Sequence, residues 1–277
     1  MIICIGMGFG VGWSIPAFIL EEKTCPIEEC PECPECPECP VCPVEPEETL
    51  VDLIKARGEL IVGTTADYPP FENFTWPFTG EIEGFDVNLS HWIADELGVN
   101  LTMVHMPFDT LISACNASTI DMIAAAMSYT EGRAEVLAPS ITYITMSQVV
   151  IVKNASSLTT ITDLTDLVGC DVGCISGTYL QYELESIPGI SVIAFASASL
   201  LIQALVTDVI EAAYVDEPIF TIWSQTEDLR IIYSTGSVSL ALWTRYGEPE
   251  LLYLINKVIF EAYLTGAIYD LMKTWFG

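Results

Sequence analysis

Positively charged side chains are scarce in this sequence. Its 277 residues include nine lysines and arginines against 38 aspartates and glutamates, and the formal net charge at pH 7 is -29. Proteins hold nucleic acids and anionic lipid headgroups largely by neutralising phosphates with Lys and Arg. We therefore expect no nucleic-acid partner for this chain.

Motifs for cofactors, metals and nucleophilic catalysis are missing as well. The sequence contains no P-loop, no GxGxxG and no His-Glu metal pattern, and its two histidines, His91 and His105, lie far apart. No Ser, His and Asp occur in an order that suggests a catalytic triad. We expect no cofactor and no catalytic metal.

The first twenty residues carry no charge at all. Met1–Leu20, read as a helix, would span about 30 Å, the thickness of a bilayer core. A secretory signal usually starts with basic residues and ends in a small-residue cleavage site, and neither is present. The segment 1–22 therefore favours a retained membrane anchor, with a cleaved signal peptide as the alternative. The acidic flank that follows it indicates that the rest of the chain lies outside the cytoplasm at the cell membrane.

Residues 23–48 form a linker rich in Cys, Pro and Glu. Its repeat favours polyproline II, which has three residues per turn and places the cysteines along one edge. We interpret it as a stiff stalk, with disulfide-linked self-association through these cysteines as a possible use. A CxxC metal site is the alternative. The cysteines of the repeat are Cys25, Cys30, Cys33, Cys36, Cys39 and Cys42.

Glycosylation is a second extracytoplasmic signature of the sequence. Asn-x-Ser/Thr sequons predict surface sites for glycans in a host that glycosylates exported proteins. The sequons lie at Asn73, Asn88, Asn100, Asn116 and Asn154. Three further cysteines, which follow apolar patterns, are expected to be buried small hydrophobes. They are Cys115, Cys170 and Cys174.

Strand and helix patterns alternate through the remainder of the chain, which predicts α/β units with parallel sheets. The alternation restarts near Gln148, so we expect two lobes joined by a hinge: 49–146 with 234–277, and 147–233. A ligand would bind in the cleft between them. The expected helices are 50–57, 84–98, 108–115, 163–167, 176–185, 198–206, 248–264 and 267–276. The expected strands are 59–65, 101–105, 120–126, 148–153, 169–175, 190–195, 209–215, 231–233 and 238–243.

One arginine stands out by its isolation. Between Glu59 and Leu229 the only positive side chains are Arg133 and Lys153. The guanidinium fork suits a carboxylate, which could belong to a ligand or to a neighbour such as Glu131 or Glu135.

Short motifs occur in a family-specific order from about Glu59 to Phe276. Over this range the chain resembles the polar amino-acid-binding family of substrate-binding proteins, the extracytoplasmic receptors of ABC importers. The resemblance implies the two-lobe type II periplasmic-binding-protein fold and ABC permease subunits as partners. The motifs are Val62-Gly-Thr, Tyr68-Pro-Pro-Phe-Glu, Gly84-Phe-Asp-Val-Asn-Leu, Asp121-Met-Ile, Ser128-Tyr-Thr-Glu-Gly-Arg, Ser176-Gly-Thr, Val215-Asp and Lys273-Thr-Trp-Phe-Gly.

The resemblance also implies which residues hold the charged groups of an amino acid. Arg133 and Ser128 would bind the α-carboxylate, and the backbone of Ala126 would contact the ligand. Thr178, after Ser176, would hold the same carboxylate from the second lobe at a helix N-terminus. Asp216 would accept hydrogen bonds from the α-ammonium.

Four further residues would surround the ligand's side chain. The resemblance places Tyr68 and Phe108 on either side of it, and Ile175 and Tyr179 where relatives vary with their ligand. Thr65 stands where relatives often carry an aspartate, which could shift recognition of the ammonium group towards Asp216 and Asp67. The Asp67 carboxylate and the aromatic walls favour a polar or cationic amino acid.

Two other functions are alternatives to a solute receptor that is not an enzyme. Cyclohexadienyl and arogenate dehydratases resemble these receptors, and such an enzyme would need a general acid, for which Asp67 is the one candidate. A structural or sensory surface protein assembled through the cysteine stalk is the other alternative.

Overall fold

The computed structural model describes residues 48–75 and 80–277. The expected membrane anchor and all but the last residue of the cysteine-rich linker lie outside these residues and stay predictions. The described chain begins with helix α1, Leu50–Arg57, as expected from the sequence. Thr49 and Asp52 start this helix by exchanging backbone-to-side-chain hydrogen bonds in a capping box.

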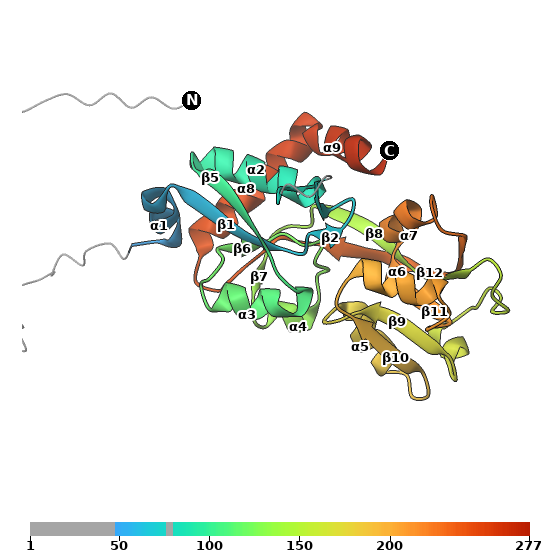
Figure 1. Ribbon diagram of the computed structural model, residues 1–277. Helices are drawn as coiled ribbons and strands as arrows, with labels where there is room; N and C mark the ends of the chain where they lie inside the picture. The colour runs from blue at the N-terminus through green and yellow to red at the C-terminus, as the bar shows by residue number, and fades with distance from the viewer. Residues whose placement is uncertain (1–47, 76–79) are drawn as a thin grey trace, which may run out of the picture. The chain divides into compact units, whose positions relative to one another are not determined.

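The first of two five-stranded sheets has the order β5-β1-β6-β13-β7 (Figure 1). Its strands are β5 (Asn100–His105), β1 (Glu59–Thr64), β6 (Met122–Ile123), β13 (Trp243–Thr244) and β7 (Ala138–Pro139). Helix α2 (Phe85–Leu97) covers one face, and α3 (Leu111–Asn116), preceded by the 3-10 turn η2 (Phe108–Thr110), covers the other. Their apolar faces pack on alternate residues of β1, as the period of two along a strand requires.

The second sheet has the order β10-β9-β11-β8-β12. Its strands are β10 (Ser191–Phe195), β9 (Asp171–Ile175), β11 (Ala212–Asp216), β8 (Ile144–Lys153) and β12 (Leu229–Leu240). Helix α5 (Tyr179–Glu185) packs on one face and α6 (Ala198–Val206) on the other, while α7 (Glu217–Trp223) follows β11. The 3-10 turn η3 (Leu164–Leu167) precedes β9.

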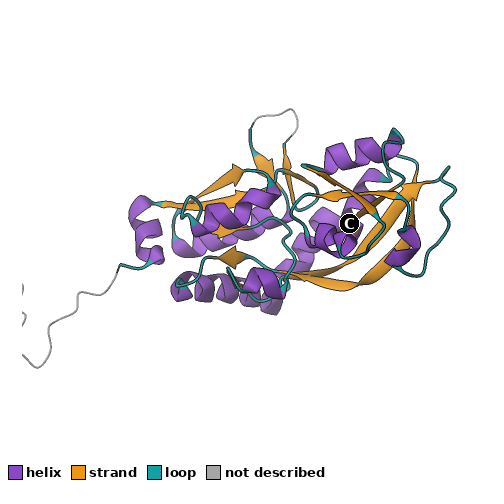
Figure 2. Cartoon of the chain, turned by 90° about the horizontal axis from the view of Figure 1, so that it is seen from below, coloured by secondary structure: helices purple, strands orange, loops and turns teal. Residues whose placement is uncertain are grey.

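The expectation of purely parallel sheets is wrong for several strands. β13 is antiparallel to β6 and β7, and β8 is antiparallel to β11 and β12. The long strands β8 and β12 pair with each other over most of their length, from Ile144–Leu240 to Lys153–Leu229 (Figure 2). They run through the lobe boundaries expected after residues 146 and 233, and so form the connection between the two sheets.

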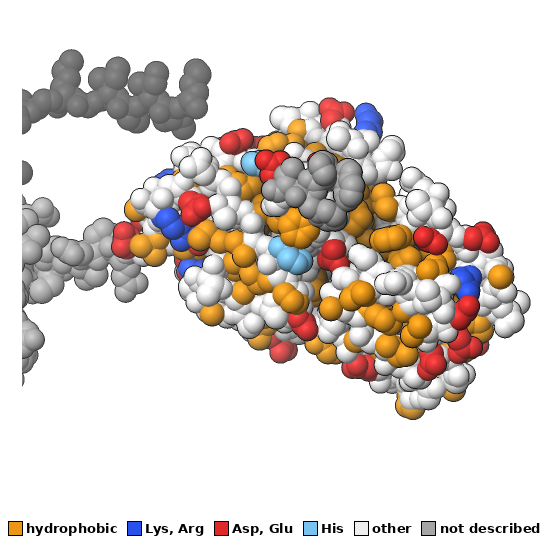
Figure 3. All heavy atoms as spheres, viewed as in Figure 1, with side chains coloured by type: hydrophobic (Ala, Val, Ile, Leu, Met, Phe, Trp, Pro, Cys, Tyr) orange, Lys and Arg blue, Asp and Glu red, His pale blue; other side chains and the backbone are white. Residues whose placement is uncertain are grey.

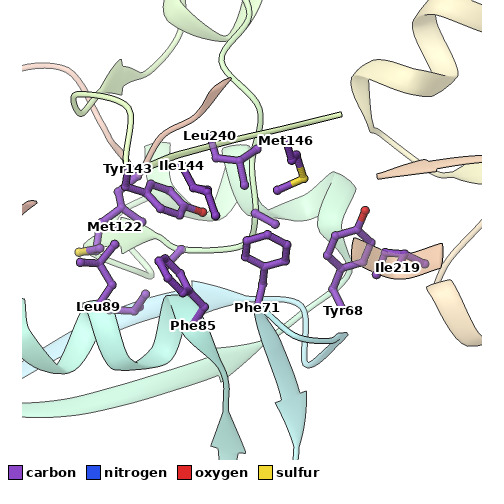
Figure 4. Packing of buried hydrophobic residues seen from close by; sticks show 14 of the residues in the cluster. Tyr68, Phe71, Phe85, Leu89, Met122, Tyr143, Ile144, Met146, Ile219 and Leu240 are labelled. Atoms are coloured by element: carbon purple, nitrogen blue, oxygen red, sulfur yellow. The ribbon is translucent and has the colours of Figure 1, made fainter. Parts of the chain in front are cut away.

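The C-terminal helices and a small sheet complete the fold around an aromatic core (Figure 4). Helices α8 (Pro249–Thr265) and α9 (Ala267–Phe276) meet at Gly266, as expected from the sequence, and its φ of 80° favours glycine. The small sheet is β2 (Asp67–Tyr68), β3 (Glu72–Phe74) and β4 (Ile82–Glu83). Phe71, Phe85 and Phe276 stack edge to face in this core.

Among the described residues, no single helix has the length and hydropathy to cross a membrane. α8 and α9 together pass that test, but they are bent by 86°.

The face in Figure 3 carries many more acidic than basic side chains, in keeping with the composition.

Sequons and cysteines differ in exposure. Asn73, Asn100, Asn116 and Asn154 are exposed, whereas Asn88 is half-buried and accepts a hydrogen bond from the Trp275 indole at 2.8 Å. Glycosylation stays a prediction, and Asn88 is the least accessible of the five.

Of the three cysteines in the described part of the chain, Cys115 and Cys174 are buried as expected, while Cys170 is half-buried.

Candidate functional site

A cavity lies where strand ends of the two sheets face each other. The space between its lining atoms is about 470 Å³, including the part open to solvent. Every site residue expected from the sequence lines this cavity. These residues are Asp67, Tyr68, Phe108, Ala126, Ser128, Arg133, Ile175, Thr178, Tyr179 and Asp216. Their contacts with a ligand stay predictions.

Arg133 belongs to the short helix α4 (Glu131–Ala134). Thr130 is the N-cap of this helix, and its hydroxyl accepts from the Arg133 backbone N–H at 3.1 Å. Arg133 is 7% exposed, and its guanidinium donates to the carbonyls of Ser128 at 2.7 Å and Gly177 at 3.2 Å. It also lies over the Phe108 ring, 5.3 Å from the centroid.

The positive charge of Arg133 has no acidic partner within ion-pair distance in the described part of the chain. Glu131 and Glu135 are exposed, so the intramolecular ion pair considered from the sequence is not formed. Burial lowers the pKa of Arg133 to about 10, so the side chain is still charged at neutral pH. A buried cation without a counter-charge is suited to bind an anion.

Asp216 supplies the opposite charge at the end of β11. It is 6% exposed, and both oxygens accept hydrogen bonds: Oδ2 from the Tyr68 hydroxyl at 2.6 Å and Oδ1 from the Gln148 amide at 3.1 Å. Burial raises the pKa of Asp216, while the two donors and the Arg133 charge oppose that shift. Tyr68 comes from the small sheet next to the first lobe, so its bond to Asp216 joins the two halves of the cavity.

The turn before α5 closes the cavity from the second lobe. Thr178 is the N-cap of α5, and its hydroxyl accepts from the Gln181 N–H at 3.4 Å and donates to the Ile175 carbonyl at 2.7 Å. The helix begins at Tyr179, later than expected from the sequence. Gly177 has a φ of 75°, and a Cβ there would lie 2.7 Å from the Cβ of Asp109 in the opposite lobe. The two lobes are therefore in direct contact beside the site.

A second carboxylate, that of Asp67, lies on the wall of the cavity. It faces the backbone N–H of Ala198 and the hydroxyl of Ser197 at the start of α6, and both lower its pKa. Burial raises the pKa more strongly, so the net direction is upwards. Its Oδ2 atom is buried and has no hydrogen-bond partner among the described residues. This carboxylate can accept a further donor.

The remaining walls are apolar or aromatic. Tyr68 is buried, Phe108 is half-buried and Tyr179 is 37% exposed, so Tyr179 lies towards solvent. Ile175 and Ala126 are buried between them. Such walls around a few polar groups are typical of a small-molecule site.

The cavity also contains residues that the sequence did not single out as ligand contacts. Gln148 lies in β8 directly before the apolar run Val149–Val152 and is buried, and a polar amide next to such a run is the signal in the sequence that could have revealed it. Ser197 precedes an apolar helix and reads as an ordinary N-cap. The full set of additional lining residues is Thr65, Ala125, Gln148, Leu180, Ala196 and Ser197.

The described residues contain no group of three or more His, Cys, Asp or Glu side chains that could hold a metal ion. The site's chemistry therefore rests on one buried cation, Arg133, and two carboxylates, Asp67 and Asp216. A cation and an anion on opposite walls of one cavity are the pair of groups that a zwitterion needs.

The chain is similar to known proteins over most of its length. The profile of the bacterial extracellular solute-binding proteins, family 3, matches residues 60–277. The L-cystine-binding protein TcyJ of Escherichia coli is 27% identical over 237 residues, which cover 83% of this chain and 87% of TcyJ. The arginine-binding extracellular protein ArtP of Bacillus subtilis is 28% identical over 225 residues, 79% of this chain and 86% of ArtP.

Solved structures show the same fold. A mutant of the arginine-binding protein ArgBP from T. maritima superposes with a TM-score of 0.77 at 34% identity, covering 82% of this chain and 98% of that structure. An ancestral amino-acid-binding protein, AncCDT-1, described as a precursor of cyclohexadienyl dehydratase, superposes with a TM-score of 0.75 at 27% identity. The match covers 83% of this chain and 100% of the AncCDT-1 chain. The two-lobe α/β fold expected from the sequence is confirmed.

Proposed function

Because the chain belongs to the bacterial extracellular solute-binding proteins of family 3, we propose that it captures a free amino acid between its lobes. It would deliver this ligand to the membrane subunits of an ABC importer from the outer side of the cell membrane. The amino acid has a polar or cationic side chain, and a cationic one fits the cavity best.

The observation that carries the proposal is the lone charge of Arg133. Taking a guanidinium out of water is costly unless an anion compensates it, and no described carboxylate lies within ion-pair distance. An α-carboxylate supplies that anion and can accept two parallel N–H bonds from the guanidinium. The Thr178 cap at the start of α5 adds polar groups on the opposite side.

Asp216 is suited to the α-ammonium of the same ligand. Its Oδ2 atom accepts from the Tyr68 hydroxyl, and an ammonium is a stronger donor to a buried carboxylate than a neutral hydroxyl is. Binding would therefore replace or share the Tyr68 bond, while the Gln148 amide keeps the carboxylate in place.

The charge balance of the cavity favours a cationic side chain. With both carboxylates ionised, Arg133, Asp67 and Asp216 sum to one negative charge, which a ligand of net charge +1 neutralises. The free Oδ2 atom of Asp67 gives the ligand's second cation a partner. Relatives named as arginine-binding and histidine-binding proteins agree with this choice.

A matched pair of ligands tests the proposal. L-Arginine and L-citrulline have nearly the same shape and differ in side-chain charge. We expect both to raise the melting temperature of the purified protein, because a ligand that binds only the folded state stabilises it by mass action. L-Arginine should bind about 10-fold to 100-fold more tightly, as a buried charge-assisted hydrogen bond is worth about 1.5–3 kcal/mol.

The variant Asp67→Asn should reduce the difference between arginine and citrulline, while Asp95→Asn, at an exposed position on α2, serves as the control. If none of the twenty amino acids stabilises the protein, the proposed function is wrong. If citrulline binds as tightly as arginine, the amino-acid site stands and the cationic class is wrong.

A dehydratase of the cyclohexadienyl or arogenate type is the second candidate, and Asp67 is the observation that favours it. Burial raises the pKa of this carboxyl group, as a general acid requires, and AncCDT-1 shares the fold. We expect no turnover of prephenate or arogenate. Product formation that Asp67→Asn abolishes would instead establish the enzyme.

A further inference from the structure

A buried carboxylate outside the cavity joins three parts of the first lobe. Asp86, in the first turn of α2, is 0% exposed. Its Oδ2 atom accepts from the Ala126 backbone N–H at 2.8 Å and from the Tyr143 hydroxyl at 2.9 Å. When Asp86 is ionised, both bonds are charge-assisted and shielded from water, which makes them stronger than their neutral counterparts.

Ala126 is the part of this network that faces the cavity. Its φ is +45°, a left-handed conformation that is unfavourable for a residue with a Cβ. Two residues later, the Ser128 carbonyl accepts from the Arg133 guanidinium at 2.7 Å. The bond from Ala126 to Asp86 therefore holds the loop that leads directly to the anion-binding arginine.

Tyr143 is the part that faces the connection between the sheets. It directly precedes β8, its N–H donates to the Leu240 carbonyl at the end of β12 at 3.1 Å, and its own carbonyl accepts from the Tyr263 hydroxyl at 2.8 Å. Figure 4 shows its ring beside Phe85 at the start of α2, and the two rings stack at 5.9 Å.

We propose that Asp86 is a positioning residue, which fixes the ligand-contacting loop at Ala126 to the base of the hinge strand β8 through Tyr143. This inference rests on the proposed function, since it assigns Asp86 a role in presenting that site. It makes the loop and the hinge one rigid unit, so that closure of the lobes delivers the Arg133 side chain in a fixed orientation.

The charges around Asp86 make the role open to a pH test. Tyr143 faces it, and Glu72 lies near enough for like-charge repulsion; Glu72 is fully buried and accepts from the Thr65 hydroxyl at 3.3 Å. Burial raises the pKa of Asp86 to about 7, with its two donors opposing the shift. Asp86 therefore changes charge near neutral pH while remaining bonded to Ala126.

The first measurement needs no ligand. In the NMR spectrum of the protein, the Ala126 amide should titrate near pH 7 and exchange slowly with solvent. Asp86→Asn should abolish the titration and keep the protection, because an amide oxygen still accepts the bond. Ser90→Ala, at a buried hydroxyl bonded to the backbone carbonyl of Asp86, should change neither. An Ala126 amide that exchanges freely with solvent in the wild type would overturn the assignment.

The second measurement is the affinity of the folded variants for L-arginine. Asp86→Ala leaves the buried Ala126 N–H unpaired and should weaken binding roughly 10-fold to 100-fold. Asp86→Asn should stay within about threefold of the wild type, a rescue that general destabilisation does not predict. Equal losses in both variants, or none in either, contradict the proposal. If the wild type binds no amino acid, the proposed function fails, and the protection of the Ala126 amide in the wild type and the variants still tests its bond to Asp86.

Discussion

Replacing Arg133 by alanine separates ligand binding from structural support. A structural arginine contributes to the stability of the protein whether or not ligand is present. An anion-binding arginine contributes mainly when the anion is bound. Arg133 is buried and bonded to two carbonyls, and no carboxylate of the residues that the structure describes pairs with it, which predicts the second behaviour.

The magnitudes follow from burial and hydrogen bonding. A pKa lowered from 12.5 to about 10 corresponds to about 3 kcal/mol of unfavourable free energy for the buried charge. The bonds to the carbonyls of Ser128 and Gly177 return about 1.5–3 kcal/mol each. The two bonds therefore offset the burial cost or exceed it by up to about 3 kcal/mol, so Arg133→Ala should lower the unfolding free energy of the ligand-free protein by about 3 kcal/mol at most. Truncating a buried, charge-paired side chain costs binding about 2–5 kcal/mol, a loss of affinity of at least roughly 30-fold.

Calorimetric titration with L-arginine and urea unfolding without ligand measure the two quantities. Arg245→Ala is the matched control, because this arginine is also mostly buried and pairs with Glu248 at 2.9 Å, away from the cavity. It should lose stability and keep its affinity. The reasoning is refuted if Arg133→Ala loses more than about 4 kcal/mol of stability while its affinity is unchanged.

Two further predictions concern lobe closure and pH. Gly177→Ala should lower ligand affinity about tenfold or more, because its φ of 75° and the 2.7 Å approach of a Cβ to Asp109 oppose closure of the lobes. Gly236→Ala, with open space around it, is the control. Equal ligand affinities of the two variants would disprove the clash. On folding, the pKa of Asp86 rises from 3.8 to about 7, so the folded state holds this proton to higher pH than the unfolded state does. The unfolding free energy should therefore fall as the pH is raised from about 4 to about 7. Asp86 alone should account for about 4 kcal/mol in urea unfolding, and stability that instead rises over this range would contradict the sign.

The sequence predicted local structure where local chemistry determines it. Helix α1 has its capping box within four residues, and Gly98 and Gly266 end α2 and α8 in left-handed conformations that favour glycine. Arg133 could be selected because few other cations occur in this acidic chain. Its N-cap, Thr130, is also local in sequence.

Prediction was poorest where pairing partners are distant. The strand expected over residues 120–126 is reduced to Met122–Ile123, because the chain leaves the sheet at Ala126 to bond Asp86. The antiparallel direction of β12 and β13 depends on partners more than 75 residues away, such as Leu240 opposite Ile144.

The sequence by itself therefore determined the α/β class, the order of most helices and strands, and the residues with the chemistry to bind a zwitterion. Only the tertiary structure showed that Tyr68 donates to Asp216 across 148 positions and that Gln148 supports the same carboxylate. It also showed that no carboxylate of the described residues lies within ion-pair distance of Arg133. The physical reason is that helix periodicity and caps act over a few residues. Burial, charge compensation and hydrogen bonding between lobes depend on the packing of the entire fold.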